Sequence, residues 1–328
     1  MARLSFKTNV DASLGEVFSF VSNPRNLPSI YPPELKLKVI ACPQKIEVGS
    51  EFSFIIRILN QEIQWKSRIT EFKEPNSFTD EAVSSPFIKW VHRHSFEADG
   101  EKTLMHEEIE FIAPFGFVGE LFSKKFVTSV MEYRNKAIMK VMGKEEEPVF
   151  KDPTKISLEL GTLISVLFVT LSILIASNIS GNLLVGIAEG LLSWVLIWFF
   201  SHDLLHLIVG ILLGIKFKEY FIGLSNVTRL GIVKGNLSYL LLALGIRIDR
   251  KKKYSRNRLA AMFFAGPVAS MVLPLFLSTL VIRNSSTVGY LLFAISIANI
   301  AFTSYFSPRE GCFAKGFRVL KRGRRGVL

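Results

Sequence analysis

The stretch "FFSHDLLHLIVGILLGIKF", residues 199 to 217, places two histidines and an aspartate in a run of leucine, isoleucine, valine and phenylalanine. Such a run is typical of a membrane-spanning helix, where a charged or polar side chain costs about 3 kcal/mol. On a helix, positions i and i+4 share a face, so His202 and His206 can present two imidazoles to one metal ion, with Asp203 beside the first. The alternative is that the histidines hydrogen-bond neighbouring helices or line a polar cavity.

The rest of the chain falls into two parts of different character. The 328 residues leave room for about two domains. Residues 1–145 mix charged and apolar residues as a soluble domain does, and residues 146–155 are a polar linker. Residues 156–328 are dominated by long apolar runs, which indicates a polytopic membrane domain.

Four apolar segments are long enough to cross a bilayer. A spanning helix needs about 20 mostly apolar residues, and the segments that qualify are 156–177, 183 to about 213, 259–282 and 288–306. A fifth piece, 237–246, is too short to cross and is interpreted as re-entrant or interfacial. The sequence therefore predicts an all-α membrane domain with about four transmembrane helices.

The net charge of +12 is concentrated in two segments, 247–258 and 309–328, each with seven basic residues and one acidic residue. Basic connections of this kind mark the cytoplasmic ends of membrane helices and contact anionic lipids, which argues against a nucleic-acid partner. We therefore expect a multi-pass protein of the cell membrane with both termini cytoplasmic. Cys42 and Cys312 fall in different domains and form no disulfide framework, as suits a reducing compartment. The N-terminus lacks a secretory signal, so the first domain should remain where it is made.

Two further motifs follow the histidine pair in order: "FAGPVASM" at 264–271 and "SPREG" at 307–311. A helix with H-x-x-x-H, a later helix with an "AGPxAN"-like motif and a final "PxxPxLDG"-like turn resemble the site-2 protease family of intramembrane zinc metalloproteases. The resemblance covers about 185–320 and implies hydrolysis of a partly unwound transmembrane helix. Close packing of small residues around a proline kink would also account for the middle motif.

Carried over residue by residue, the resemblance makes His202 and His206 zinc ligands and Asp203 the catalytic acid/base. Gly266 and Pro267 align with the packing motif. Glu310 becomes the first choice for the third ligand, and Cys312 is the second choice because thiolate is the softer ligand. This sequence departs from the family in having aspartate for the catalytic glutamate, glutamate for the ligand aspartate and Ser270 for an asparagine.

The sequence of the soluble half predicts a strand over 2–10 and a long amphipathic helix over 119–143. Between them it predicts a helix whose N-cap is Ser13, with Glu16 three residues after the cap. Period-two segments, typical of strands, recur at 36–42, 50–59, 62–73, 87–97 and 103–112. With "EVFSFVSNPRNLPSIYPP", "FIKWVHRHSFEA" and "PFGFVGELF" in order, residues 3–142 resemble the SRPBCC (START-like, helix-grip) superfamily, in particular its polyketide cyclase/dehydrase-like branch. The resemblance implies an α+β helix-grip domain that encloses a hydrophobic small-molecule ligand.

Candidate pocket residues lie on the strands of this domain. Alternation puts Trp90, His92 and His94 on one face of the segment 87–97, where aromatic rings would contact an apolar ligand and imidazoles its polar end. Trp65 and Glu107 complete the predicted pocket. The alternative is that the tryptophans are core and that the histidines bond to backbone or to Glu107.

Three functions remain open. The first is a membrane zinc metalloprotease-like protein whose cytoplasmic START-like domain binds a hydrophobic ligand and adjusts access to the membrane site. The second is a non-enzymatic lipid- or quinone-binding protein, a carrier or sensor, with a degenerate protease-like membrane anchor. The third is a cyclase-type enzyme that uses His92 or His94 with Glu107.

Overall fold

The computed structural model describes residues 1–328 except 60, 144–146, 228–241, 250–251 and 322–328. The chain divides into two compact units, Met1–Thr154 and Lys155–Leu328. Part of the segment predicted as a linker belongs to the first unit, because the backbone oxygen of Lys151 accepts a hydrogen bond from Ser129 and Phe150 packs on Tyr133.

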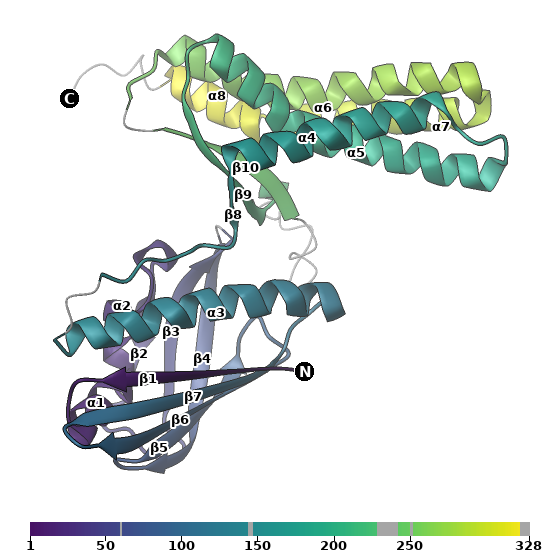
Figure 1. The fold of residues 1–328 in the computed structure, drawn as a ribbon. Coiled ribbons are helices and arrows are strands. Elements are labelled where there is room, and N and C mark those ends of the chain that lie inside the picture. Colours follow the sequence, from purple (N-terminus) through teal and green to yellow (C-terminus); the bar gives the residue numbers. More distant parts are fainter. Residues whose placement is uncertain (60, 144–146, 228–241, 250–251, 322–328) are drawn as a thin grey trace. The chain divides into compact units, whose positions relative to one another are not determined.

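The first unit is called the soluble unit below, after the domain that the sequence predicts there. It is a curved antiparallel sheet that holds one long helix, α3 (Figure 1). Its strand order is β1-β7-β6-β5-β4-β3-β2, and all pairs are antiparallel. This is the predicted helix-grip fold, and that prediction is confirmed. The elements are β1 (Ala2–Val10), α1 (Leu14–Val21), η1 (Pro24–Asn26), α2 (Leu27–Ile30), η2 (Pro33–Leu35), β2 (Lys38–Ala41), β3 (Glu51–Ile58), β4 (Gln61–Lys73), β5 (Ser77–Ser84), β6 (Lys89–Asp99), β7 (Lys102–Ile112) and α3 (Gly116–Val141).

The core of this unit lies between the concave face of the sheet and the helices. Phe18 of α1 packs edge-on against Phe78 and Phe96 of the sheet, and Phe126 and Ile138 bring the apolar face of α3 into the same core. Each large side chain buried in this way contributes about 2 kcal/mol. Strand β5 is the one strand of the sheet that the sequence analysis did not predict.

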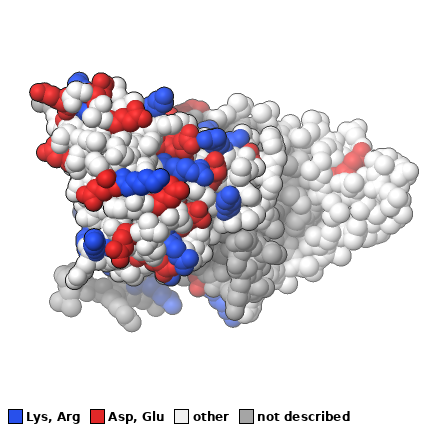
Figure 2. Space-filling model, turned by 90° about the horizontal axis from the view of Figure 1, so that it is seen from below, with Lys and Arg blue, Asp and Glu red and all other residues white. Residues whose placement is uncertain are grey.

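The second unit contains four helices that are long and apolar enough to cross a membrane, as the sequence predicts. Their most apolar windows have mean hydropathies of 1.6 to 2.3. In Figure 2 charged side chains crowd the visible face of the soluble unit, whereas the visible surface of the membrane helices is almost uncharged. The helices are α4 (Leu158–Ser177), α5 (Leu183–Leu212), α6 (Arg256–Asn284) and α7 (Ser286–Phe306), followed by the short α8 (Cys312–Lys321).

Beside these helices lies a small antiparallel sheet that the sequence analysis did not predict. Its order is β10-β9-β8, formed by Leu242–Ile248, Phe217–Leu224 and Lys155–Ser157. Of the segment 237–246 interpreted as re-entrant or interfacial, residues 242–246 belong to strand β10, and 237–241 lie outside the described residues.

Polar side chains join the membrane helices at points of close approach. Ser172 of α4 donates a hydrogen bond to the backbone oxygen of Ser193 on α5 at 2.7 Å, and Trp194 donates to Ser296 of α7 at 2.8 Å. Such bonds satisfy polar groups where lipid offers no partner. They hold α5, which carries the histidine pair, between α4 and α7.

Candidate functional site

Helix α5 presents its histidine pair on one face. His202 and His206 are one turn apart, and their ring centroids are 4.8 Å apart. At about 1.5 Å per residue the helix is about 45 Å long, so it exceeds the apolar thickness of a bilayer. The pair lies in the second half of this helix, toward the end that leads to β9.

Helix α6 fixes the orientation of both rings. Nδ1 of His206 lies 2.6 Å from the backbone oxygen of Met262, which accepts its hydrogen bond, and Nδ1 of His202 lies 3.3 Å from Oγ of Ser270. These contacts engage Nδ1 of each ring and leave Nε2 as the nitrogen that could bind an ion. Second partners of this kind hold ligand histidines in one tautomer and one orientation.

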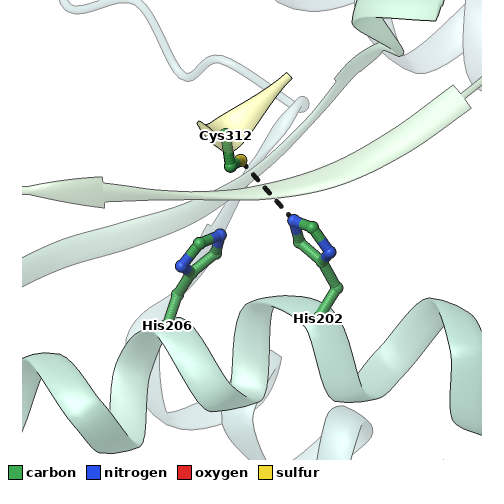
Figure 3. Close-up of side chains that lie close together, drawn as sticks. All are labelled: His202, His206 and Cys312. Carbon is green, nitrogen blue, oxygen red and sulfur yellow. Dashed lines mark hydrogen bonds between the residues drawn. The ribbon is translucent and has the colours of Figure 1, made fainter. Parts of the chain in front are cut away.

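Cys312, the first residue of α8, completes the group. Its Sγ lies 3.6 Å from Nε2 of His202, and the ligand atoms of His202, His206 and Cys312 all lie within 4.8 Å of one another. In Figure 3 both rings project from α5 toward the cysteine. A nitrogen and a sulfur on one tetrahedral zinc ion are about 3.5 Å apart, so the His202–Cys312 pair already has this spacing.

The turn between α7 and α8 places the cysteine. Ser307 accepts hydrogen bonds at its Oγ from the backbone nitrogen of Phe313 and at its backbone oxygen from that of Ala314, at 3.1 and 2.8 Å. Phe313 then packs on Phe264 of α6. Burial raises the pKa of the Cys312 thiol to about 11. The thiol is therefore neutral, and a metal ion that bound it would have to displace its proton.

Glu310, the first choice for the third ligand, does not belong to this group among the described residues. Its backbone nitrogen bonds to the oxygen of Phe306 within the turn. The geometry supports the second choice, Cys312, because the start of α8 rather than the turn faces the imidazoles. The role of Glu310 stays a prediction.

Asp203, the predicted acid/base, is 5 % exposed and follows His202 on α5. It is not one of the three grouped ligands. Lys315, one turn into α8, interacts electrostatically with Asp203 and with Cys312. The aspartate is thus buried, with the positive charge of Lys315 in range.

Gly266 leaves room for Nε2 of His206. A Cβ at this position would lie 2.3 Å from Nε2, closer than any real contact. The close packing expected of the "AGP" motif is confirmed, and its contact is with the imidazole.

We expect Gly266→Ala to lower zinc affinity roughly 10–100-fold, as loss of an orienting partner does, because the methyl group must displace either the ring or α6. Competition with a fluorescent zinc chelator measures the effect in the purified protein. Val268→Ala, a substitution at an exposed site on the same helix, serves as the control and should bind zinc as the wild type does. An unchanged affinity in Gly266→Ala would remove His206 from the set of ligands.

A second group of polar side chains lies on the concave face of the soluble sheet. The pairing puts Asp80 of β5 opposite His92 of β6, and His94 opposite Glu107 of β7. All four are less than 9 % exposed. Glu107 is fully buried, and Arg134 of α3 donates a hydrogen bond to it.

The electrostatics of this group follow from its burial. Burial opposes ionisation of Glu107, but Arg134 and the two imidazoles outweigh it, so the pKa of Glu107 lies well below its ordinary value. Burial also opposes ionisation of Asp80, yet His94 and His92 hold its pKa below the usual range. Burial, the largest cause, lowers the pKa of His92 to about 4.

The two predicted pocket tryptophans pack together. Trp65 and Trp90 have ring centroids 5.1 Å apart, and Phe54, Phe87 and Phe111 surround them. His92 and His94 lie beside Glu107, as the alternative interpretation expected. A hollow of about 940 Å³ lies between α1 and the end of α3, and its lining does not include any of the five predicted pocket residues.

Comparison with solved structures gives matches over the N-terminal part of the chain. A START superfamily protein from Mycobacterium smegmatis is 18% identical, with a TM-score of 0.37, over 43% of this chain and 96% of that one. A protein from Arthrobacter aurescens is 13% identical, with a TM-score of 0.38, over 45% and 90% of the two chains. One from Thermus thermophilus is 16% identical, with a TM-score of 0.33, over 43% and 94%. No family model and no curated protein matches the chain.

Proposed function

We propose that this protein is an intramembrane zinc hydrolase of the site-2 protease type, in which His202, His206 and Cys312 hold the ion. The observation that carries the proposal is the approach of two imidazole nitrogens and one thiol, from α5 and α8, to within 4.8 Å of one another. Three protein ligands suit a catalytic zinc ion, because structural zinc sites have four.

The chain's own residues supply the remaining parts of a hydrolytic site. A bound zinc ion would act as a Lewis acid and lower the pKa of a water molecule to about 7. Asp203 would accept the proton of that water and return it to the leaving amine. Met262 and Ser270 would keep the two rings aligned, and the surrounding apolar helices suit a substrate segment that lies in the membrane.

The test uses the full-length protein, loaded with zinc and reconstituted in liposomes with model transmembrane peptides whose helices contain glycine and proline. We expect cleavage, detected by mass spectrometry, and a loss of about 100-fold or more with Asp203→Ala, because general-base catalysis contributes roughly that much. The control is Glu189→Ala on the same helix, outside the site. Absence of cleavage by zinc-loaded protein, or full activity of Asp203→Ala, would contradict the proposal.

A second candidate function rests on the soluble unit. We infer that this helix-grip domain binds a hydrophobic small molecule. The open hollow between α1 and the end of α3 offers it Phe20, Val141 and Met142, and the polar side chains Asp11, Glu16 and Asn23 of the same lining would contact a polar end of that molecule. In this alternative the membrane helices are an anchor and the histidines are structural. Purified protein without zinc in wild type and in His206→Ala would favour it over the hydrolase.

The proposed orientation has both termini on the cytoplasmic side. The basic segments 247–258 and 309–328 support it, because lysine and arginine gather on that side of membrane proteins. The soluble unit would then meet its ligand in the cytoplasm or at the inner leaflet.

A further inference from the structure

The concave face of the soluble sheet holds charged groups that neither proposed function uses. Glu107 is paired with Arg134, whereas Asp80 faces His92 and His94. Two carboxylates and one guanidinium leave one negative charge inside the domain. A buried charge of this kind needs a cation, either a proton or a metal ion.

Asp80 and the two histidines lie close enough together to hold one metal ion. Its Oδ2 lies 3.5 Å from Nε2 of His94 and 3.9 Å from Nδ1 of His92, and the ligand atoms of all three residues lie within 4.8 Å of one another. Ligands of one tetrahedral ion with bonds near 2.0 Å are about 3.3 Å apart. Small rotations of the side chains would bring all three within bonding distance of a single ion.

The opposite nitrogen of each ring faces a second carboxylate. Oε1 of Glu107 lies 2.9 Å from Nδ1 of His94 and 3.3 Å from Nε2 of His92, and Arg134 donates to the same oxygen. Carboxylate–histidine–metal arrangements fix the tautomer of ligand histidines in this way. The two imidazoles thus lie between a ligand-type carboxylate on one side and an orienting one on the other.

The hydrogen bonds of this group are incomplete. Nε2 of His92, Nδ1 of His94 and Oε2 of Glu107 are buried, and none has a partner in hydrogen-bond geometry among the described residues. Buried polar atoms left in this state are costly. A cation bound by Asp80 and the rings would fix each ring with its N–H toward Glu107 and remove part of that cost.

We propose that Asp80, His92 and His94 form a second metal site, in the soluble unit, for a divalent first-row transition ion. Two imidazoles and one carboxylate suit zinc and iron(II), and they leave coordination positions open. This ligand set contains no sulfur. It therefore differs chemically from the group formed by His202, His206 and Cys312, which is called the membrane group below.

The test uses the full-length double variant His206→Ala/Cys312→Ser, which lacks two ligands of the membrane group, loaded with Co²⁺ and freed of excess metal. We expect one equivalent of cobalt and an absorption spectrum without a thiolate-to-cobalt charge-transfer band. Adding Asp80→Asn or His94→Gln should remove that equivalent. His106→Ala, which changes the one histidine outside both groups, should keep it.

Folding of the variants is checked by the thermal transition of the soluble unit. Cobalt should raise this transition in the double variant, since a ligand that binds only the native state stabilises it, and should leave the Asp80→Asn protein unchanged. A folded double variant that retains no cobalt would overturn the proposal, and so would equal retention with Asp80→Asn. Because the double variant has lost the membrane ligands, either outcome is independent of the hydrolase proposal.

Discussion

Arg134→Met should destabilise the soluble unit by about 3–5 kcal/mol, because it leaves the fully buried carboxylate of Glu107 without its cation. Methionine keeps most of the volume of the arginine stem, so the loss measures charge rather than packing. Urea unfolding followed by tryptophan fluorescence would report the change, since Trp65 and Trp90 lie in this unit.

Two further variants test whether the loss of the buried charge causes the destabilisation in Arg134→Met. Lys125→Met, at an exposed position on the same helix, should change stability by less than about 0.5 kcal/mol. Replacing both members of the pair, Glu107→Gln with Arg134→Met, should recover much of the loss because the buried group then has the same net charge as in the wild type. A destabilisation below about 1 kcal/mol in Arg134→Met would mean that Glu107 is protonated or otherwise neutralised in the native state.

Cys312→Ser should remove one equivalent of zinc per chain under limiting free metal. The oxygen of serine is a harder and far weaker zinc ligand than a thiolate. The loss of affinity should exceed the roughly 10–100-fold that follows removal of an outer partner. In cobalt-loaded protein the thiolate-to-cobalt band should disappear, which elemental analysis alone would not reveal.

The matched control for this variant is Cys42→Ser, which changes the other cysteine of the chain, in the soluble unit. It should keep both the zinc equivalent and the charge-transfer band. Glu310→Gln tests the first choice of the sequence analysis in the same assay. If zinc is lost with Glu310→Gln and kept with Cys312→Ser, the turn rather than α8 supplies the third ligand.

The helices and most strands could be predicted because each is determined by a pattern within its own stretch of sequence. Apolar length fixes a spanning helix, and period-two alternation fixes a half-buried strand. Strand β5 was missed for a physical reason: Asp80 occupies an inward position where the alternation calls for an apolar residue. The same residue belongs to the polar group proposed as a metal site. The break in the alternation therefore marks the position of a candidate ligand.

The third member of the membrane group could be predicted only as a choice between two residues. Glu310 and Cys312 are two positions apart, and which one faces His202 depends on where the turn ends and α8 begins. That boundary is set by Ser307, whose side chain and backbone bond to the first turn of α8. The softness of thiolate favoured Cys312 from the start, whereas alignment of the motif favoured Glu310.

Pro274 links the proposed metal centre to a helix that supplies none of its three grouped residues. Because proline has no N–H, the backbone oxygen of Ser270 is free of its usual helical bond, and the side chain of Asn299 on α7 donates to it at 2.8 Å. The hydroxyl of the same serine lies against the ring of His202. A sideways shift of α7 would therefore rotate that imidazole through Asn299 and Ser270. In this way a helix that supplies no ligand could change the geometry of the proposed metal site.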